Sequence, residues 1–201
     1  MIVTVVACLL SALISALLYL ALYRPLYSHP YPGEIIDVIP AASSVSLAEL
    51  ERWVSEDLST IMARRLTPRE RRLASRRRRK IIAERLVPVE ANARLILAFT
   101  RQQVRMLRSR PPGPRSERDR LMEELFHHAQ YCCLLLTFAK GSRIFMPWDT
   151  RRLIKFHRDI VMNEIRELLL LFLNVSATYG ERYRDNLLAA LDVWELAEER
   201  G

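Results

Sequence analysis

The side chains best suited to metal chemistry lie in the segment DRLMEELFHHAQYCC, residues 119–133. Glu124 and His127 have the Glu-x-x-His spacing that di-iron helical bundles use. His128 and Cys132 are four positions apart, which places them on one face of a helix at a spacing able to bind a metal. A second Glu-x-x-His is missing, because the position three before His157 holds an isoleucine. A metal-binding helical enzyme is therefore an alternative hypothesis, with Glu124, His127, His128 and His157 as its candidate ligands.

The chain contains none of the short motifs of the common catalytic classes. It has no Gly-rich phosphate loop, no Gly-x-Ser-x-Gly and no Cys-x-x-Cys, and only 5 of its 201 residues are glycine. Cys132 and Cys133 are sequence neighbours and Cys8 lies in an apolar run, so the three cysteines do not form a disulfide framework. The sequence therefore favours a non-enzymatic protein, and we assign it no catalytic residue and no cofactor.

Positive charge is concentrated in one stretch that contains the run RRRRK. Residues 64–85 hold 11 Lys or Arg and 2 Glu, a local net charge of +9, whereas the remaining 20 basic and 21 acidic residues give −1. At about 100° per residue, five of these arginines share one side of a helix and the others project elsewhere. The candidate anion-binding residues are Arg65, Arg69, Arg72, Arg76, Arg77, Arg78, Arg79 and Lys80.

Four surroundings are compatible with this basic helix. It is either simply solvated, or it contacts anionic lipid headgroups, an acidic protein or nucleic acid. Lipid headgroups attract each basic residue by about 1 kcal/mol near the surface, and Arg side chains bind carboxylates in a bidentate manner. Nucleic acid is disfavoured, because the run has no interleaved aromatic residues and matches no DNA-binding motif.

The N-terminal segment from Ile2 to Tyr23 has no charge and no helix breaker. About 20 such residues cross a hydrocarbon core of roughly 30 Å, so we predict a single transmembrane helix. A secretory signal is disfavoured because no Lys or Arg precedes Arg24. Since the flanking basic residues follow the helix, the N-terminus is predicted outside and the rest of the chain in the cytoplasm. Small residues, Ser11, Ala12, Ser15 and Ala16, suit packing in a homo- or hetero-oligomer.

The chain beyond the membrane divides at about residue 45. Residues 25–45 hold four prolines and a glycine, and we predict a juxtamembrane tether with a strand-like EIIDVI segment. Residues 46–201 have helical periodicity. The predicted domains are thus an anchor at 1–24, a tether at 25–45 and a basic helical domain at 46–201, and the predicted fold is all-α, an antiparallel bundle of four or five helices.

Capping signals and breakers set the predicted helix bounds. Ser46 with Glu49 starts a helix over 47–65, and Thr67 with Pro68 and Glu70 starts one over 68–109, kinked or broken near residue 86 by a proline at 88. Ser116 caps a helix over 117–140 that a glycine at 141 ends. Two more span about 149–174 and 181–199. The predicted inner faces are Leu50, Trp53, Val54, Leu58 and Ile61; Leu153, Phe156, Ile160, Ile165, Leu168, Leu169 and Phe172; and Tyr183, Leu187, Leu188, Leu191 and Trp194.

Together these features predict a membrane-anchored binding or assembly module. Its basic helix would contact anionic lipid headgroups or an acidic protein partner, and the module would act by positioning rather than by catalysis.

Overall fold

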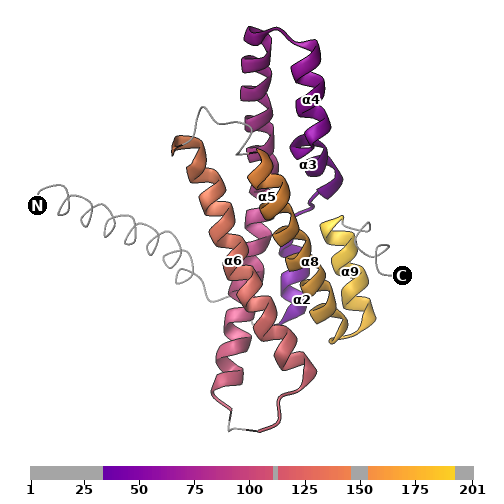
Figure 1. The fold of residues 1–201 in the computed structure, drawn as a ribbon. Helices are drawn as coiled ribbons and strands as arrows, with labels where there is room; N and C mark the ends of the chain where they lie inside the picture. Colours follow the sequence, from indigo (N-terminus) through magenta and orange to yellow (C-terminus); the bar gives the residue numbers. More distant parts are fainter. Residues whose placement is uncertain (1–33, 111–112, 146–153, 193–201) are drawn as a thin grey trace, which may run out of the picture.

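The computed structural model describes residues 34–110, 113–145 and 154–192. These residues are all-helical and contain no strand, which confirms the predicted fold class. One long helix, α5 (Pro68–Arg108), is 41 residues and therefore about 60 Å long, and α6 packs along it as its main partner (Figure 1). It begins as predicted: the Thr67 hydroxyl accepts from the Glu70 N–H at 3.4 Å, and the Glu70 carboxylate accepts from the Thr67 N–H at 2.9 Å.

The predicted helix over 47–65 is two helices, α3 (Leu47–Val54) and α4 (Glu56–Arg65). Ser46 caps α3 by accepting from the Glu49 N–H at 3.3 Å, as expected. The chain then leaves the helical conformation at Ser55, which has φ −60° and ψ 148°, and the Ser55 hydroxyl accepts from the Leu58 N–H. Serine suits this break because its side chain replaces a backbone hydrogen bond at a new helix start.

The predicted strand-like segment EIIDVI is helical in the structure, so that prediction is wrong. Residues 35–41 form the short helix α2 (Ile35–Val38) and the 3₁₀ turn η1 (Ile39–Ala41), and Ile35 and Val38 are buried in the core. Just after them, the buried Asn92 side chain accepts from the Ser43 N–H and donates to the Ser43 carbonyl, both at 2.7 Å. This end of the predicted tether therefore packs into the bundle.

The chain returns along α5 as α6 (Glu117–Phe145), then continues through the π-helical turn η2 (His157–Val161), α8 (Met162–Ala177) and α9 (Glu181–Leu191). Ser116 caps α6 as predicted, accepting from the Asp119 N–H at 3.2 Å. α5 is one helix through Pro88, so the break that was the alternative to a kink there does not occur, and α6 continues past Gly141, where its end was predicted. A single lost hydrogen bond or a single glycine costs less than the packing of each helix against its partner contributes.

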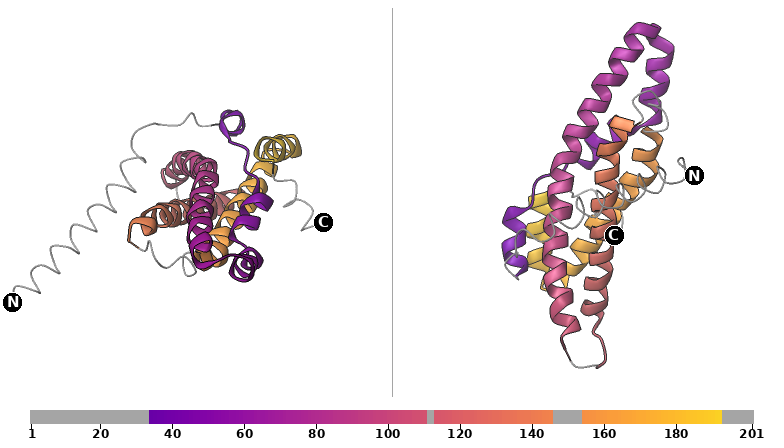
Figure 2. Two further views of the ribbon diagram at one scale, coloured as in Figure 1. Left: turned by 90° about the horizontal axis from the view of Figure 1, so that it is seen from above. Right: turned by 90° about the vertical axis from the view of Figure 1, so that its left-hand side faces the viewer.

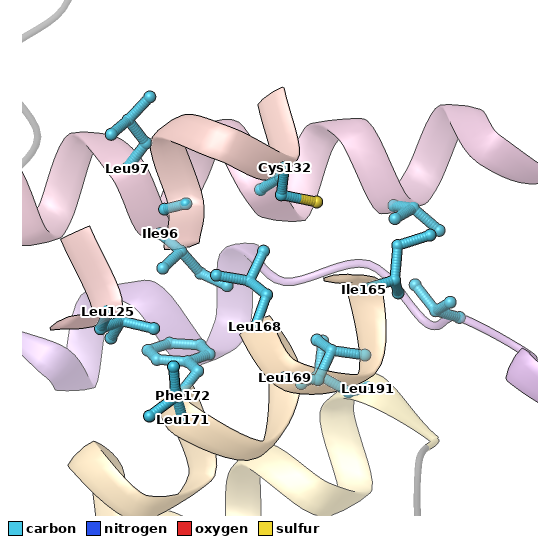
Figure 3. Close-up of a cluster of buried hydrophobic side chains, with 14 of the residues drawn as sticks. Ile96, Leu97, Leu125, Cys132, Ile165, Leu168, Leu169, Leu171, Phe172 and Leu191 are labelled. Carbon is cyan, nitrogen blue, oxygen red and sulfur yellow. The ribbon is translucent and has the colours of Figure 1, made fainter. Parts of the chain in front are cut away.

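The core lies where α5, α6 and α8 meet, and α9 and α2 close its side (Figures 2 and 3). Most of the predicted inner residues are buried, but Ile61 is 50% and Ile160 is 43% exposed. Ile160 was predicted on the wrong face because the buried positions before Ile165 are Ile154, His157, Val161 and Met162, which lie along one side of the helix. The labelled centre of this core contains Ile96, Leu97, Leu125, Cys132, Ile165, Leu168, Leu169, Leu171, Phe172 and Leu191.

Several predictions concern residues outside the described ranges. The apolar segment 2–23, the first part of the tether (25–33), the start of the predicted fourth helix with Leu153, and the end of the fifth with Trp194 lie there. Among the residues that the structure does describe, no helix combines the length and the apolar character needed to cross a bilayer.

Candidate anion-binding site on a helical arm

The basic residues lie on a two-helix projection, which we call the helical arm and define as α4 together with residues 68–80 of α5. In Figures 1 and 2 the arm extends beyond the ends of α6 and α8, so its tip is surrounded by solvent on most sides. The arm makes little contact with the core: α4 has no buried residue, and neither do the first ten residues of α5. The arm is thus a surface element carried by the core.

Arg78 is the exception within the basic run, because its side chain is only 2% exposed. Its Nε donates to the Trp53 carbonyl at 2.6 Å and its Nη2 to the Ser55 carbonyl at 2.7 Å, while Nη1 donates to the Ser59 hydroxyl at 2.6 Å. These carbonyls lie at the C-terminal end of α3, where carbonyl groups lack helical partners and the helix dipole is negative. Burial lowers the pKa of Arg78 to about 10, which leaves the guanidinium protonated at neutral pH.

The assignment of Arg78 to the anion-binding set is therefore corrected. Its guanidinium joins α5 to the break between α3 and α4 and is turned away from solvent. Arg71, also on the arm, plays a lesser version of the same role: its Nη2 donates to the Ala63 carbonyl at 2.7 Å, near the end of α4. Arg78 is a structural residue, and an external anion has no access to it.

The other predicted residues keep their charge on the outside. Six of them are exposed: Arg65, Arg69, Arg72, Arg76, Arg77 and Lys80. Arg79 is half-buried and makes an internal contact. Arg64, which the sequence reasoning omitted from the site, is exposed on the same arm and extends this set. The sequence could have identified Arg64, because it lies in the same basic stretch, just before the capping box of α5.

Little acidic charge on the arm compensates this set. The Glu70 carboxylate accepts from Thr67, and these hydrogen bonds lower the pKa of Glu70. Lys80 is 3.8 Å from Glu84, but both side chains are well exposed, and such pairs contribute little to stability. Within the described part of the chain, no carboxylate is within ion-pair distance of Arg69, Arg72, Arg76 or Arg77.

The four candidate metal ligands are not brought together. Glu124 and His127 are exposed, and the His127 ring packs edge-on against Phe126. His128 Nδ1 is 2.8 Å from Glu164 Oε1 on α8, a contact that links two core helices. His157 is buried and lies edge-on to the neighbouring Phe156 ring. Across residues 34–110, 113–145 and 154–192, no three His, Cys, Asp or Glu side chains gather closely enough to hold a metal ion.

The two described cysteines lie in the core and are poorly placed for nucleophilic chemistry. Burial raises the pKa of the Cys133 thiol to about 11. Burial, with the neighbouring Cys133 and Glu164, raises the pKa of Cys132 still more. The thiolate is the reactive form, so both thiols are expected to be inert near neutral pH.

This expectation is testable by alkylation with iodoacetamide at mildly alkaline pH. In the folded chain Cys133 is expected to react at least about 100-fold more slowly than in denaturant. A rise of two pKa units lowers the population of the reactive thiolate by about that factor. Mass spectrometry of the peptide that contains Cys132 and Cys133 follows the reaction. Equal rates in the folded and denatured chain would show that the thiols are not buried.

The comparisons with known proteins add no further constraint on this site. Family models, curated proteins and solved structures were compared with the chain, and none matches it. The functional argument therefore rests on the residues of the chain and their geometry.

Proposed function

We propose that this chain is a membrane-anchored binding module whose helical arm binds the anionic lipid headgroups of the leaflet that its folded domain faces. The supporting observation is the exposed, uncompensated charge of the arm, carried by residues such as Arg72, Arg76 and Arg77. The six exposed cations predicted from the sequence, at about 1 kcal/mol each when close to the surface, suffice to orient a domain even if only half of them make contact.

Exposed apolar side chains on the arm support a lipid surface over plain solvent. Ile61 on α4 is 50% exposed and Leu73 on α5 is 54% exposed, both among arginines. A surface that combines cations with apolar side chains matches the boundary between headgroups and acyl chains, where Arg side chains also extend their charge toward phosphate. An acidic protein surface is the competing partner, because Arg binds carboxylates well.

The predicted membrane anchor would hold the folded bundle close to the bilayer. Since α2 already packs into the bundle, the chain between the apolar segment 2–23 and Glu34 is only the segment 24–33. Ten residues span at most about 35 Å when fully extended. An anchored bundle would therefore remain within reach of the bilayer, and the arm, on a helix about 60 Å long, would meet headgroups as the nearest dense anions.

The first experiment tests the anchor separately from the arm. The full chain is expected to float with neutral phosphatidylcholine vesicles and to stay bound in high salt, since an apolar span does not depend on charge. Release by salt, or recovery of the chain in the soluble fraction, would remove the anchor from the proposal.

A second experiment measures the arm itself in lipid nanodiscs. Leu73→Cys, made in a Cys8→Ser background, receives an environment-sensitive fluorophore, and headgroup-labelled spin lipids serve as quenchers. Quenching is expected in discs that contain phosphatidylserine, and high salt is expected to abolish it. Arg76→Gln with Arg77→Gln should lower the arm-binding equilibrium constant roughly 30-fold, the loss of two contacts of about 1 kcal/mol each.

The matched control is Arg105→Gln with Arg108→Gln, two exposed arginines at the opposite end of α5. This variant removes the same charge and should keep the quenching, because its arginines are far from the arm. An equal loss in both variants would mean that net charge alone attracts the chain, and absence of quenching in anionic discs would favour an acidic protein or nucleic acid as the partner of the arm.

A further inference from the structure

A cavity lined by charged, hydroxyl and apolar side chains lies at the base of the helical arm. It has a volume of about 410 Å³ and is formed between α4 and residues 154–158, at the start of η2. In Figure 1 the arm rises beside the end of the bundle where this part of the chain begins. Its lining residues are Glu56, Ser59, Thr60, Ala63 and Arg64 from α4, and Ile154, Lys155 and Arg158 from the other side. We call this cavity the arm-base groove.

The acidic groups near the groove are already engaged. Arg158 Nη1 donates to the Glu56 carboxylate and Arg158 Nε to the Asp159 carboxylate, both at 2.6 Å. The hydrogen bond from Arg158 lowers the pKa of Asp159. With Glu56 held by Arg158, Arg64 and Lys155 are the other cations of the lining. Counting the nearby Asp159, whose pKa the charge of Lys155 also lowers, three cations exceed two carboxylates by one.

The hydroxyl groups of the groove are also arranged as donors. The Ser59 hydroxyl oxygen accepts from the buried Arg78 guanidinium at 2.6 Å. A hydroxyl has one proton to donate, and that proton is left for another acceptor. The Thr60 hydroxyl, on the same turn of α4, also lines the groove and can donate its proton. The groove therefore presents mainly donors, and the ligand that suits it is rich in acceptor oxygens.

We propose that the arm-base groove binds a phosphate monoester group, with Arg64 and Lys155 neutralising its charge and Ser59 and Thr60 donating hydrogen bonds. The volume falls within the range of small-molecule sites, and guanidinium and ammonium groups are the usual protein ligands of phosphate. The inference rests on the proposed function in one respect: a bilayer headgroup is one source of such a group, and a soluble phosphate compound is the other.

The test titrates inorganic phosphate into the full chain and follows binding by calorimetry and by ³¹P NMR. Saturable binding is expected. Lys155→Gln should weaken it roughly tenfold by removing one charge-assisted contact, and Thr60→Val should weaken it by a smaller factor. Arg182→Gln, an exposed charge change on α9 outside the groove, is the control and should leave binding unchanged. Circular dichroism checks that each variant is folded.

A second titration distinguishes the sources. Dispersed short-chain phosphatidic acid that binds more tightly than inorganic phosphate would identify a lipid headgroup, and equal or tighter binding of inorganic phosphate would identify a soluble ligand; both outcomes support the groove. Absence of saturable binding by either compound, or equal weakening by Lys155→Gln and Arg182→Gln, would overturn it. Because these titrations use no bilayer, the groove and the headgroup contacts of the arm can fail independently.

Discussion

Replacement of Arg78 by alanine is expected to lower the free energy of unfolding by roughly 3 kcal/mol. The substitution removes three hydrogen bonds from a guanidinium that is 2% exposed, and it leaves the Trp53 and Ser55 carbonyls without this donor at the base of the arm. Buried backbone carbonyls that lose their partner contribute the larger part of the loss. Urea denaturation followed by circular dichroism measures the effect.

The neighbouring Arg77 provides a control that differs by one position. Arg77→Ala removes the same side chain from the same helix but from an exposed position, so its effect should stay within about 0.5 kcal/mol. Arg78→Lys should recover only part of the stability, because an ammonium group cannot reproduce the fork that spans two carbonyls and a hydroxyl. Equal stability of the Arg77→Ala and Arg78→Ala variants would contradict the structural role.

Replacement of Phe99 by alanine is expected to have the largest effect on stability, a loss of about 3–5 kcal/mol. Phe99 is completely buried in the C-terminal half of α5 and belongs to the same core cluster as buried residues of α6 and α8. Removing the ring leaves a cavity that the rigid helices cannot close. Denaturant unfolding reports the change, and an unaltered dependence on denaturant concentration would confirm that the fold itself is kept.

Phe138 is the matched control for this substitution. It is 55% exposed on α6, and its main described contact is edge-to-face with the Phe156 ring at 5.4 Å. Phe138→Ala should therefore lower the free energy of unfolding by no more than about 1.5 kcal/mol. If Phe138→Ala were as damaging as Phe99→Ala, the exposed and buried faces of the bundle would be assigned wrongly.

The starts of the helices could be predicted from the sequence because capping is local chemistry. Ser46, Thr67 and Ser116 each accept from an N–H three residues later, and the spacing alone identifies them. The all-α fold follows from the same short-range patterns and from apolar residues at helical spacing. These parts of the structure required no knowledge of distant contacts.

The interruptions could not be predicted, because packing decides them. The sequence indicated a kink or a break near Pro88 and an end at Gly141, and both helices continue, whereas the helix that was predicted over 47–65 is interrupted at Ser55. A helix is retained through an unfavourable residue when it lies along a partner, and it is interrupted when its direction must change. Both conditions depend on neighbours remote in sequence.

The candidate site shows the same division. Composition was enough to predict a basic surface, and six of its eight predicted residues are exposed. It could not separate Arg78 from Arg77, because their difference arises from the unpredicted break at Ser55, 23 residues away. Likewise His128 was considered as a metal ligand because its partner Glu164, 36 residues later, is not visible in local spacing.

The continuity of α5 links the basic arm to the core mechanically. The same unbroken helix carries the exposed arginines at one end and the fully buried Phe99 within the core. The described helix runs through Pro88 without an interruption between the arm and the core. A partner that binds the arm therefore also orients the whole bundle, because one helix belongs to both. The exposed faces of α6 and α9 then have a fixed direction relative to that partner.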